Sequence, residues 1–484
     1  MFPTVLLLAL IACTPKHGDT AVTTESRDTA PDDTDGSGDS GDAAADLVVD
    51  ASATVHSEVA TVLWVDWTQS EAAEVYLEFT FGDEGWLTTP AADRAAGAHR
   101  EALLGVPADT EVTFQLVASD DESADGPATF GPWTAATGPL PDDIPVPTLL
   151  TWDERLTTEH PWVLGSVAAE AGRGNEPYWV VITDRLGRIV WYREPPYGAS
   201  TNWPRVALDG THLIVDEANP FGIGDHEDQI RRMSLDLAFD ETWPVPMGWI
   251  YGESEGGGIL YDQPDEGYSA FSLVELRPDG ELRTLWDCTA WIDGRSDATW
   301  GCGANSIIWN PDTDTILWSM FDPSTVAEID RQTGTLVRYF GQIDGGWAFD
   351  PPGSVFDLQH WVHYTPEGTI LASTHLVDEV GVQRAHEYRL DADTETLELI
   401  WSYGEGVDRY ASGMGEVTRY EVADGSRNAL INYGPQGYVR EVTAEGELAW
   451  ELDWDRQHLN GHSTLIADLY AINEGWSGRE PDAP

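Results

Sequence analysis

The chain has 484 residues, and its 85 aspartates and glutamates against 25 lysines and arginines give a formal net charge of −60. This charge excludes a nucleic-acid-binding protein, because clustered basic side chains supply the affinity for phosphate backbones. It also disfavours adhesion to an anionic membrane through a basic patch. The hydrophobic content of 41%, with 22 tryptophans, is sufficient for a large buried core, and 47 glycines with 29 prolines favour turns over long helices.

The first residues have the features of an export signal. Residues 5–12 form an apolar run far shorter than the roughly 20 residues that span a bilayer. The run ends in Leu10-Ile11-Ala12-Cys13, which resembles the bacterial lipobox. The resemblance implies a signal peptide over residues 1–12 and a lipid anchor on Cys13; an ordinary cleaved signal, with no role for Cys13, is the alternative. We expect export and attachment to the outer membrane or cell surface, the periplasmic face being the alternative, with membrane contact only through the lipid.

Residues 13–46 consist almost wholly of Asp, Thr, Ser, Gly, Ala and Glu and contain no aromatic residue. Such a segment cannot bury enough apolar surface to offset the entropy cost of ordering, so it is predicted to be an acidic, disordered tether. The stretch 33–39 has calcium-loop spacing but lacks the terminal glutamate of an EF-hand loop.

The chain has three cysteines, Cys13, Cys288 and Cys302. If Cys13 carries a lipid, the other two form an even pair in an oxidising compartment, which is consistent with one disulfide that closes a short loop. Two reduced cysteines are the alternative. Two cysteines cannot build a closed zinc site without histidines.

Residues 47–139 are predicted to form a small β-sandwich. The segments 60–67, 73–79 and 111–117 alternate apolar and polar residues, as half-buried strands do. The segment resembles a fibronectin type III module. A proline-rich joint over residues 139–147 separates it from the rest of the chain.

From residue 149 to 476 one local unit recurs: a strand, a turn that carries Asp and usually Gly, and a strand that ends near an aromatic residue. Four short antiparallel strands per roughly 50 residues is the pitch of a β-propeller. We therefore predict an all-β chain, with a six-bladed β-propeller preceded by the sandwich. The tryptophans are expected first to pack blade against blade. The six hairpins are 182–191, 233–243, 274–286, 328–340, 388–401 and 441–450.

Three stretches of this region, 303–330, 358–371 and 414–451, resemble the bacterial arylsulfotransferase family. The resemblance implies an exported six-bladed propeller with an N-terminal β domain and an active site in the central channel. Family members transfer a sulfuryl group from a phenolic sulfate to a phenol through a covalent sulfohistidine. No cofactor is implied, and the expected partners are small phenolic sulfates or phenols. We expect a monomer.

Residue by residue, the resemblance makes His360 the catalytic nucleophile and Asn305 the amide that binds sulfonate oxygens. Gln359, beside the nucleophile, and Arg384 match further family positions and are assigned to substrate binding, a structural role being the alternative for Arg384. His363, three residues after His360, suggests a metal site, but residues i and i+3 of a regular strand face opposite sides. No metal is therefore expected.

Gly303 and Phe321 stand where the family has a histidine and an arginine, so the sequence departs from the family pattern at these two positions. Three functions therefore remain open. The first is sulfuryl transfer through His360, projecting into a solvent-filled axial channel. The second is a catalytically degenerate propeller that binds a phenolic, glycan or peptide ligand, in which His360 only forms hydrogen bonds. The third is a structural surface protein.

Overall fold

The computed structural model describes residues 47–119, 127–169, 178–219, 227–248, 250–265, 271–295, 302–376, 382–407, 409–411, 413–423, 425–455 and 460–473. The predicted signal peptide, Cys13 and the tether to residue 46 lie outside these ranges. The described chain is all-β: it has 34 strands, the short helix α1 (Cys288–Ile292) and four 3-10 helices at Glu255–Gly257, Pro352–Ser354, Gly434–Gln436 and Ala471–Asn473. In these ranges no helix has the length and apolar character that crossing a bilayer requires.

Two antiparallel sheets form the N-terminal module, where alternation of apolar residues predicted strands. The first sheet has the order β1 (Val48–Val55), β2 (Leu63–Gln69), β6 (Gly97–Leu103). The second has the order β4 (Leu87–Thr88), β3 (Ala73–Phe81), β7 (Glu111–Ser119), β8 (Ala128–Ala136), and β5 (Ala92–Arg94) also pairs with β3. Val65 and Trp67 of one sheet and Leu77 and Phe114 of the other belong to one buried apolar cluster.

The rest of the described chain forms six further sheets of four or five strands. The first three, in spatial order of strands, are β12 (Ile189–Arg193), β11 (Tyr178–Asp184), β10 (Trp162–Ala168), β34 (Asn460–Ile466); β13 (Arg205–Val206), β14 (Leu213–Glu217), β15 (Gln229–Met233), β16 (Asp240–Pro244); and β17 (Tyr251–Ser254), β18 (Gly258–Pro264), β19 (Phe271–Leu276), β20 (Leu282–Asp287).

The other three sheets follow in the chain. They are β21 (Ala304–Asn310), β22 (Thr315–Met320), β23 (Thr325–Asp330), β24 (Leu336–Gly341); β25 (Ala348–Asp350), β29 (Thr396–Tyr403), β28 (Val382–Asp391), β27 (Ile370–Leu376), β26 (His360–Tyr364); and β30 (Glu416–Glu421), β31 (Arg427–Asn432), β32 (Tyr438–Val442), β33 (Leu448–Asp453), β9 (Thr148–Trp152). Every pairing is antiparallel except that of β25 with β29, which is parallel. All six predicted hairpins are present in these sheets.

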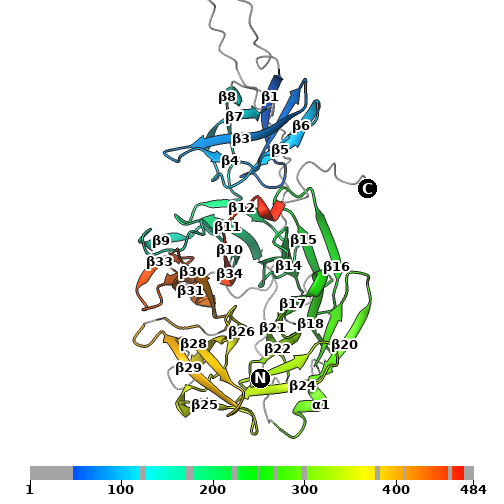
Figure 1. Cartoon of the computed structure of the whole chain (residues 1–484), viewed down its shortest axis with the longest axis vertical. Helices are drawn as coiled ribbons and strands as arrows, with labels where there is room; N and C mark the ends of the chain where they lie inside the picture. The colour runs from blue at the N-terminus through cyan, green and yellow to red at the C-terminus, as the bar shows by residue number, and fades with distance from the viewer. Residues whose placement is uncertain are drawn as a thin grey trace, which may run out of the picture.

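The six sheets form a closed, propeller-like ring, with the N-terminal module docked on one side (Figure 1). The ring is closed twice by strands from opposite ends of the region. The C-terminal strand β34 pairs with β10 of the first sheet, and the early strand β9 pairs with β33 of the last sheet. Because the chain ends are hydrogen-bonded into each other's sheets, the ring cannot open without breaking strand pairs.

Tryptophans join neighbouring sheets, as predicted from their recurrence. Three of them lie on the second strand of a predicted hairpin. Each donates its Nε1–H to a main-chain oxygen in a turn of the next sheet. The pairs are Trp191 with Leu235 at 2.8 Å, Trp401 with Ala444 at 2.9 Å and Trp450 with Arg185 at 2.7 Å. A buried indole N–H needs such an acceptor, so the repeat specifies how adjacent sheets dock.

Part of the acidic excess lies inside the ring. Four sheets carry a glutamate that is almost fully buried on the third strand from the axis, and each glutamate pairs with an arginine: Glu275 with Arg331 at 2.7 Å, Glu328 with Arg338, Glu387 with Arg419 at 3.1 Å and Glu441 with Arg185 at 2.9 Å. Buried charges are tolerated when they are paired and hydrogen-bonded. These carboxylates are therefore structural.

The N-terminal module is fixed to the ring by polar and apolar contacts. Two tyrosine hydroxyls of the ring region accept hydrogen bonds from backbone N–H groups of the module: Tyr192 from Ala60 at 3.0 Å and Tyr470 from Leu104 at 3.1 Å. Val59, Val62 and Leu104 of the module share a buried cluster with Ile189 and Leu469 of the ring region. A shared core of this kind argues for one rigid unit rather than two parts on a hinge.

Candidate functional site

The predicted catalytic residue lies on the innermost strand of its sheet. His360 is the first residue of β26, the strand of the fifth sheet next to the axis. Its side chain is only 7% exposed. It packs between two rings, Phe321 with centroids 5.1 Å apart and His375 in a near-parallel stack at 5.2 Å. The expectation of a solvent-filled surrounding for this ring is therefore wrong: apolar and imidazole rings of the protein cover it.

The His360 imidazole is neutral. Burial, followed by the neighbouring His375, lowers its pKa well below the ordinary value. The backbone N–H of Met414 makes a long contact with His360 Nε2, at 3.4 Å, which favours the tautomer that carries the ring hydrogen on Nδ1. No described residue pairs with Nδ1. The lone pair that a nucleophile would use is thus directed at a main-chain amide of the protein itself.

The two amide side chains assigned to substrate binding contact the protein instead. Asn305, near the start of β21, donates its Nδ2–H to the main-chain oxygen of Gln359. Gln359 donates from Nε2 to Ser319 Oγ at 3.0 Å and to the oxygen of Met320 at 2.8 Å. These bonds connect β26 to the fourth sheet. The donors of both amides are therefore directed at protein acceptors, and none of these hydrogen bonds points toward the His360 ring.

Arg384 lies on the other face of the sheet. It pairs with Thr374 across β27 and β28, whereas His360 pairs with Ser373. Residues directly opposite each other across antiparallel strands share a face, and consecutive residues alternate faces. The positive charge of Arg384 is instead felt by His386 on its own face, where it adds to the lowering of the pKa by burial, to about 4. The structure does not bring Arg384 to the nucleophile.

The second histidine of β26 is placed differently from the sequence expectation. His360 pairs with Ser373 and His363 with Leu371, and the register shifts between them. The irregularity inserts an extra residue, so both histidines face the same side of the sheet, and the assumption of a regular strand was wrong. Within the described ranges, no three His, Cys, Asp or Glu side chains gather closely enough to hold a metal ion.

Where the innermost strands converge, aromatic side chains fill the space. Trp361 has a left-handed backbone conformation, φ 50°, and its ring lies parallel to that of Trp203 at 5.8 Å. His462 of β34 contacts Trp361 at 4.2 Å between ring centroids. Arg205 of β13 lies over Trp361 at 5.3 Å and over Tyr251 of β17 at 4.4 Å. Side chains from four innermost strands thus form a packed axial cluster, which sequence reasoning did not anticipate.

Arg205 lies on β13, one of these innermost strands, and donates to the main-chain oxygen of Tyr251 at 2.9 Å. Arg231 pairs with Glu217 at 2.6 Å on the outer part of the second sheet, and Arg232 donates to His212 at 3.0 Å. Arg295 lies over Trp291, beyond the end of α1. Within the described residues, no hydrogen bond or ring contact joins any of these guanidinium groups to His360, so none of them takes the place of the arginine expected at position 321.

Cys288 and Cys302 are joined by a disulfide, with an S–S distance of 2.01 Å. The bond connects the first residue of α1 to the chain that enters β21 two residues later. Both sulfurs are buried in the apolar cluster between the third and fourth sheets. The sequence had left reduced cysteines open as the alternative.

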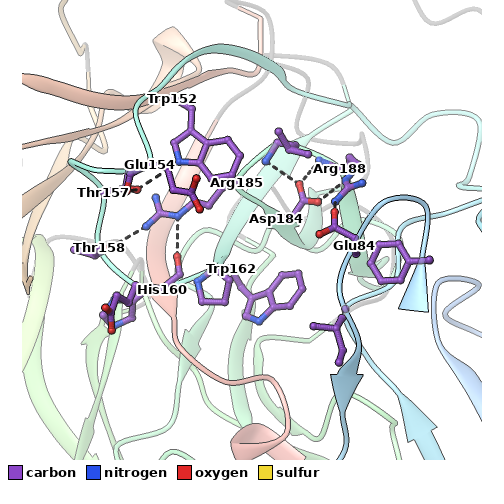
Figure 2. Close-up of a pocket in the computed structure, with 16 residues that line it drawn as sticks. Glu84, Trp152, Glu154, Thr157, Thr158, His160, Trp162, Asp184, Arg185 and Arg188 are labelled. Atoms are coloured by element: carbon purple, nitrogen blue, oxygen red, sulfur yellow. Dashed lines mark hydrogen bonds and ion pairs between the residues drawn. The ribbon is translucent and has the colours of Figure 1, made fainter. Parts of the chain in front are cut away.

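A cavity of about 540 Å³ lies between the N-terminal module and the ring, and we call it the junction cavity (Figure 2). The module supplies Phe81, Glu84, Leu87 and Gly105. The ring supplies the segment from Trp152 to Trp162 and the turn 184–188 between β11 and β12. Its walls come from segments that are distant in the sequence, which is why no local motif revealed it.

Ion pairs neutralise both arginines of the junction cavity. Arg188 lies between Asp184, at 2.5 Å, and Glu84, at 2.8 Å (Figure 2). Arg185 is buried, pairs with Glu441 at 2.9 Å and donates from Nε to the oxygen of His160 at 2.7 Å. Burial, followed by the charge of Arg185, lowers the pKa of His160, which is thus neutral.

No protein family model and no curated protein matches the chain. Solved structures that share its outline include a protein of unknown function from Desulfotomaculum acetoxidans, with 14% identity over 74% of this chain and 95% of that one and a TM-score of 0.40. A chain of a nidogen/laminin complex has 12% identity over 63% of this chain and 99% of that one, also at 0.40.

Hydrazine synthase of Kuenenia stuttgartiensis has 13% identity, covers 56% of this chain and 74% of that one, and gives a TM-score of 0.34. These TM-scores are low, so the likenesses carry no inference about function. The arrangement of this chain's own sheets is the basis for describing it as propeller-like.

Proposed function

We propose that the chain is an exported, lipid-anchored binding protein, built as a six-bladed β-propeller preceded by a fibronectin type III-like sandwich. In this proposal the arylsulfotransferase-like site is catalytically degenerate. Six sheets in a closed ring, antiparallel except for one strand pair, support six blades, and two sheets around one apolar core support the sandwich. The lipobox-like Leu10-Ile11-Ala12-Cys13 supports display at the outer membrane or cell surface.

One observation carries the loss of catalysis: the donor groups of the two candidate substrate-binding amides form hydrogen bonds within the protein. His360 Nε2 accepts from the Met414 amide, and the amides of Asn305 and Gln359 donate to neighbouring strands. Sulfuryl transfer develops negative charge on the sulfonate oxygens and on the leaving phenolate, and donors aimed at that charge provide most of the stabilisation. Loss of a single such donor costs about 2.7–4 kcal/mol, or 10²–10³ in rate.

The substitutions on the catalytic side of the sheet act in the same direction. Phe321, where the family has an arginine, puts an apolar ring against His360. An aromatic ring in place of a guanidinium removes a cation and also shields the imidazole from a sulfonate. Gly303 likewise removes an imidazole. The site keeps a histidine of the required type without its cationic partners.

The experiment is a transfer assay with 4-nitrophenyl sulfate as donor and a phenol as acceptor. We expect nitrophenolate release at the background rate, equal for the wild-type chain and for His360→Ala. Restoring the family residue, Phe321→Arg, tests the reason: an increase in release that depends on His360 would show that the missing cation limits the reaction. Release by the wild-type chain that His360→Ala abolishes would contradict the proposal.

Sulfuryl transfer through His360 is the second candidate, and one observation favours it. The imidazole is neutral, as a nucleophile must be, and its Nδ1 has no partner among the described residues. In the other tautomer Nδ1 would carry the free lone pair. A sulfohistidine trapped after incubation with the aryl sulfate, and absent in His360→Ala, would establish this function.

A further inference from the structure

The junction cavity has a fixed shape. Its two sides are held together by the hydrogen bonds of Tyr192 and Tyr470 and by a shared buried cluster. Arg188, from the ring, forms an ion pair with Glu84 of the module directly at the cavity wall. A preformed cavity requires little ordering when a ligand enters, which favours binding.

The cavity has an accessible apolar surface. Trp152, on the edge strand β9, is 39% exposed, and Leu186, in the turn 184–188, is 40% exposed. Trp162 forms a further wall, and Gly105 permits its close approach: a Cβ on Gly105 would lie 2.8 Å from the indole, and the backbone there has φ +85°. Trp152 and Leu186 are thus the large exposed apolar side chains among the residues that line the cavity.

The charge of the cavity is negative. Its arginines are already satisfied, Arg188 by two carboxylates and Arg185 by Glu441. Glu154 and Glu159 also line the cavity, and neither forms an ion pair with any described residue. Both follow Trp152 in the segment 152–162 that lines the cavity, so the same wall offers carboxylates and an indole. The net charge of −60 strengthens the attraction for cations over the whole surface.

We infer that the junction cavity binds an organic cation, an ammonium or guanidinium group attached to an apolar body. The apolar body would lie on Trp152 and Leu186, and the cation would face Glu154 and Glu159. An indole attracts cations through its quadrupole, and adjacent carboxylates add charge complementarity. An aryl sulfate, by contrast, would meet unpaired carboxylates. The inference rests on the proposed binding function and supplies its site and ligand class.

The test compares three ligands of the same shape by isothermal titration calorimetry at 150 mM salt. They are 2-phenylethylamine, the neutral 2-phenylethanol and the anionic 3-phenylpropanoate. We expect the amine to bind at least tenfold more tightly than the alcohol and the carboxylate not to bind. A peptide with a single lysine beside a phenylalanine distinguishes the source: tighter binding than the free amine would indicate a peptide side chain, and weaker binding a small amine.

Variants locate the binding in the cavity. Trp152→Ala and the double variant Glu154→Gln/Glu159→Gln should each weaken binding of the amine at least tenfold. The controls Tyr197→Ala and Glu405→Gln, which change exposed residues outside the cavity, should leave binding unchanged. Thermal melting establishes that each variant is folded.

Besides failure of the amine to bind, three results would overturn the inference. They are equal binding of amine and alcohol, binding that Trp152→Ala leaves intact, and tighter binding of a neutral oligosaccharide than of the amine, which would assign the cavity to glycans. The transfer assay is independent of these titrations. Aryl sulfate turnover would contradict the proposed function, whereas failure of the amine to bind would contradict only the assignment of the cavity.

Discussion

Arg384 and His360 lie on opposite faces of the same five-stranded sheet, because Arg384 pairs with Thr374 and His360 with Ser373. The two residues are 24 positions apart, and the sequence resemblance led us to expect both in one site. Ala372, on the face of Arg384, packs in the apolar cluster shared with the fourth sheet. Ala385, on the face of His360, packs in the cluster shared with the sixth sheet. The strand register therefore directs the two faces toward different neighbouring sheets. Matching residue types are therefore insufficient evidence for a catalytic site.

The buried ion pair between the first and last sheets should be essential for stability. Glu441 is fully buried, pairs with Arg185 and accepts from the Thr158 backbone at 2.7 Å. Glu441→Gln leaves a buried guanidinium without its counter-charge, which we expect to lower the free energy of unfolding by about 3–5 kcal/mol in urea titrations. The exposed pair of Glu398 with Arg389 is the control, and Glu398→Gln should cause little change. Similar losses in both variants would contradict the expectation.

Gly105 should be intolerant of a side chain at the module–ring junction. Gly105→Ala places a Cβ 2.8 Å from the Trp162 indole, so the ring must move and the junction cavity must change shape. We expect a loss of about 1–3 kcal/mol in the free energy of unfolding. Gly210 also has a left-handed backbone, φ +78°, but nothing lies within 4 Å of its Cβ position. The difference between Gly105→Ala and Gly210→Ala therefore isolates the steric part, and equal losses would show that only backbone conformation matters.

The disulfide should contribute measurably to stability. It links residues 14 apart in sequence, and closing a loop of this length stabilises a fold by about 3 kcal/mol through the unfolded state. The variant Cys288→Ser/Cys302→Ser should lose about that amount in the free energy of unfolding. Reductant should destabilise the wild-type chain toward the same value and leave the variant unchanged. A wild-type chain insensitive to reductant under unfolding conditions would contradict this prediction.

Acid should destabilise the ring through its buried histidines. Burial lowers the pKa of His375 from 6.5 to about 4, so the folded state binds its proton less readily than the unfolded state. Above pH 6.5 the ring is neutral in both states and does not lower the free energy of unfolding. As the pH falls toward 4, the unfolded state gains the proton first, and the free energy of unfolding decreases. At pH 5 the cost of His375 alone should be about 2 kcal/mol relative to pH 7.

The variant His375→Gln provides the measurement. Its free energy of unfolding should change less between pH 7 and pH 5 than that of the wild-type chain, by about 2 kcal/mol. His360, which stacks on His375, and His386 retain their own acid sensitivity. Identical pH dependence in the two proteins would mean that His375 accepts its proton without penalty.

The amino-acid sequence alone was sufficient for the local units. Each predicted hairpin combines alternating apolar residues with a turn of Asp and usually Gly, as at 274–286, where Arg277–Gly280 closes the turn. These features act within about ten residues, so they can be recognised in the sequence without knowledge of the rest of the chain. The tryptophans that follow the hairpins also indicated contacts between repeats, and Trp191, Trp401 and Trp450 form the same bond to the next sheet.

Only the tertiary structure decided what surrounds the functional residues. The register shift between His360 and His363 puts both on one face, and no sequence pattern marks it. Trp361 contacts Trp203, 158 positions away, and the walls of the junction cavity bring Gly105 against Trp162, 57 positions away. Such contacts depend on how strands pair and how sheets dock, which are cooperative properties of the whole ring. Residue spacing specifies strands locally, whereas the direction of each side chain is set by long-range packing.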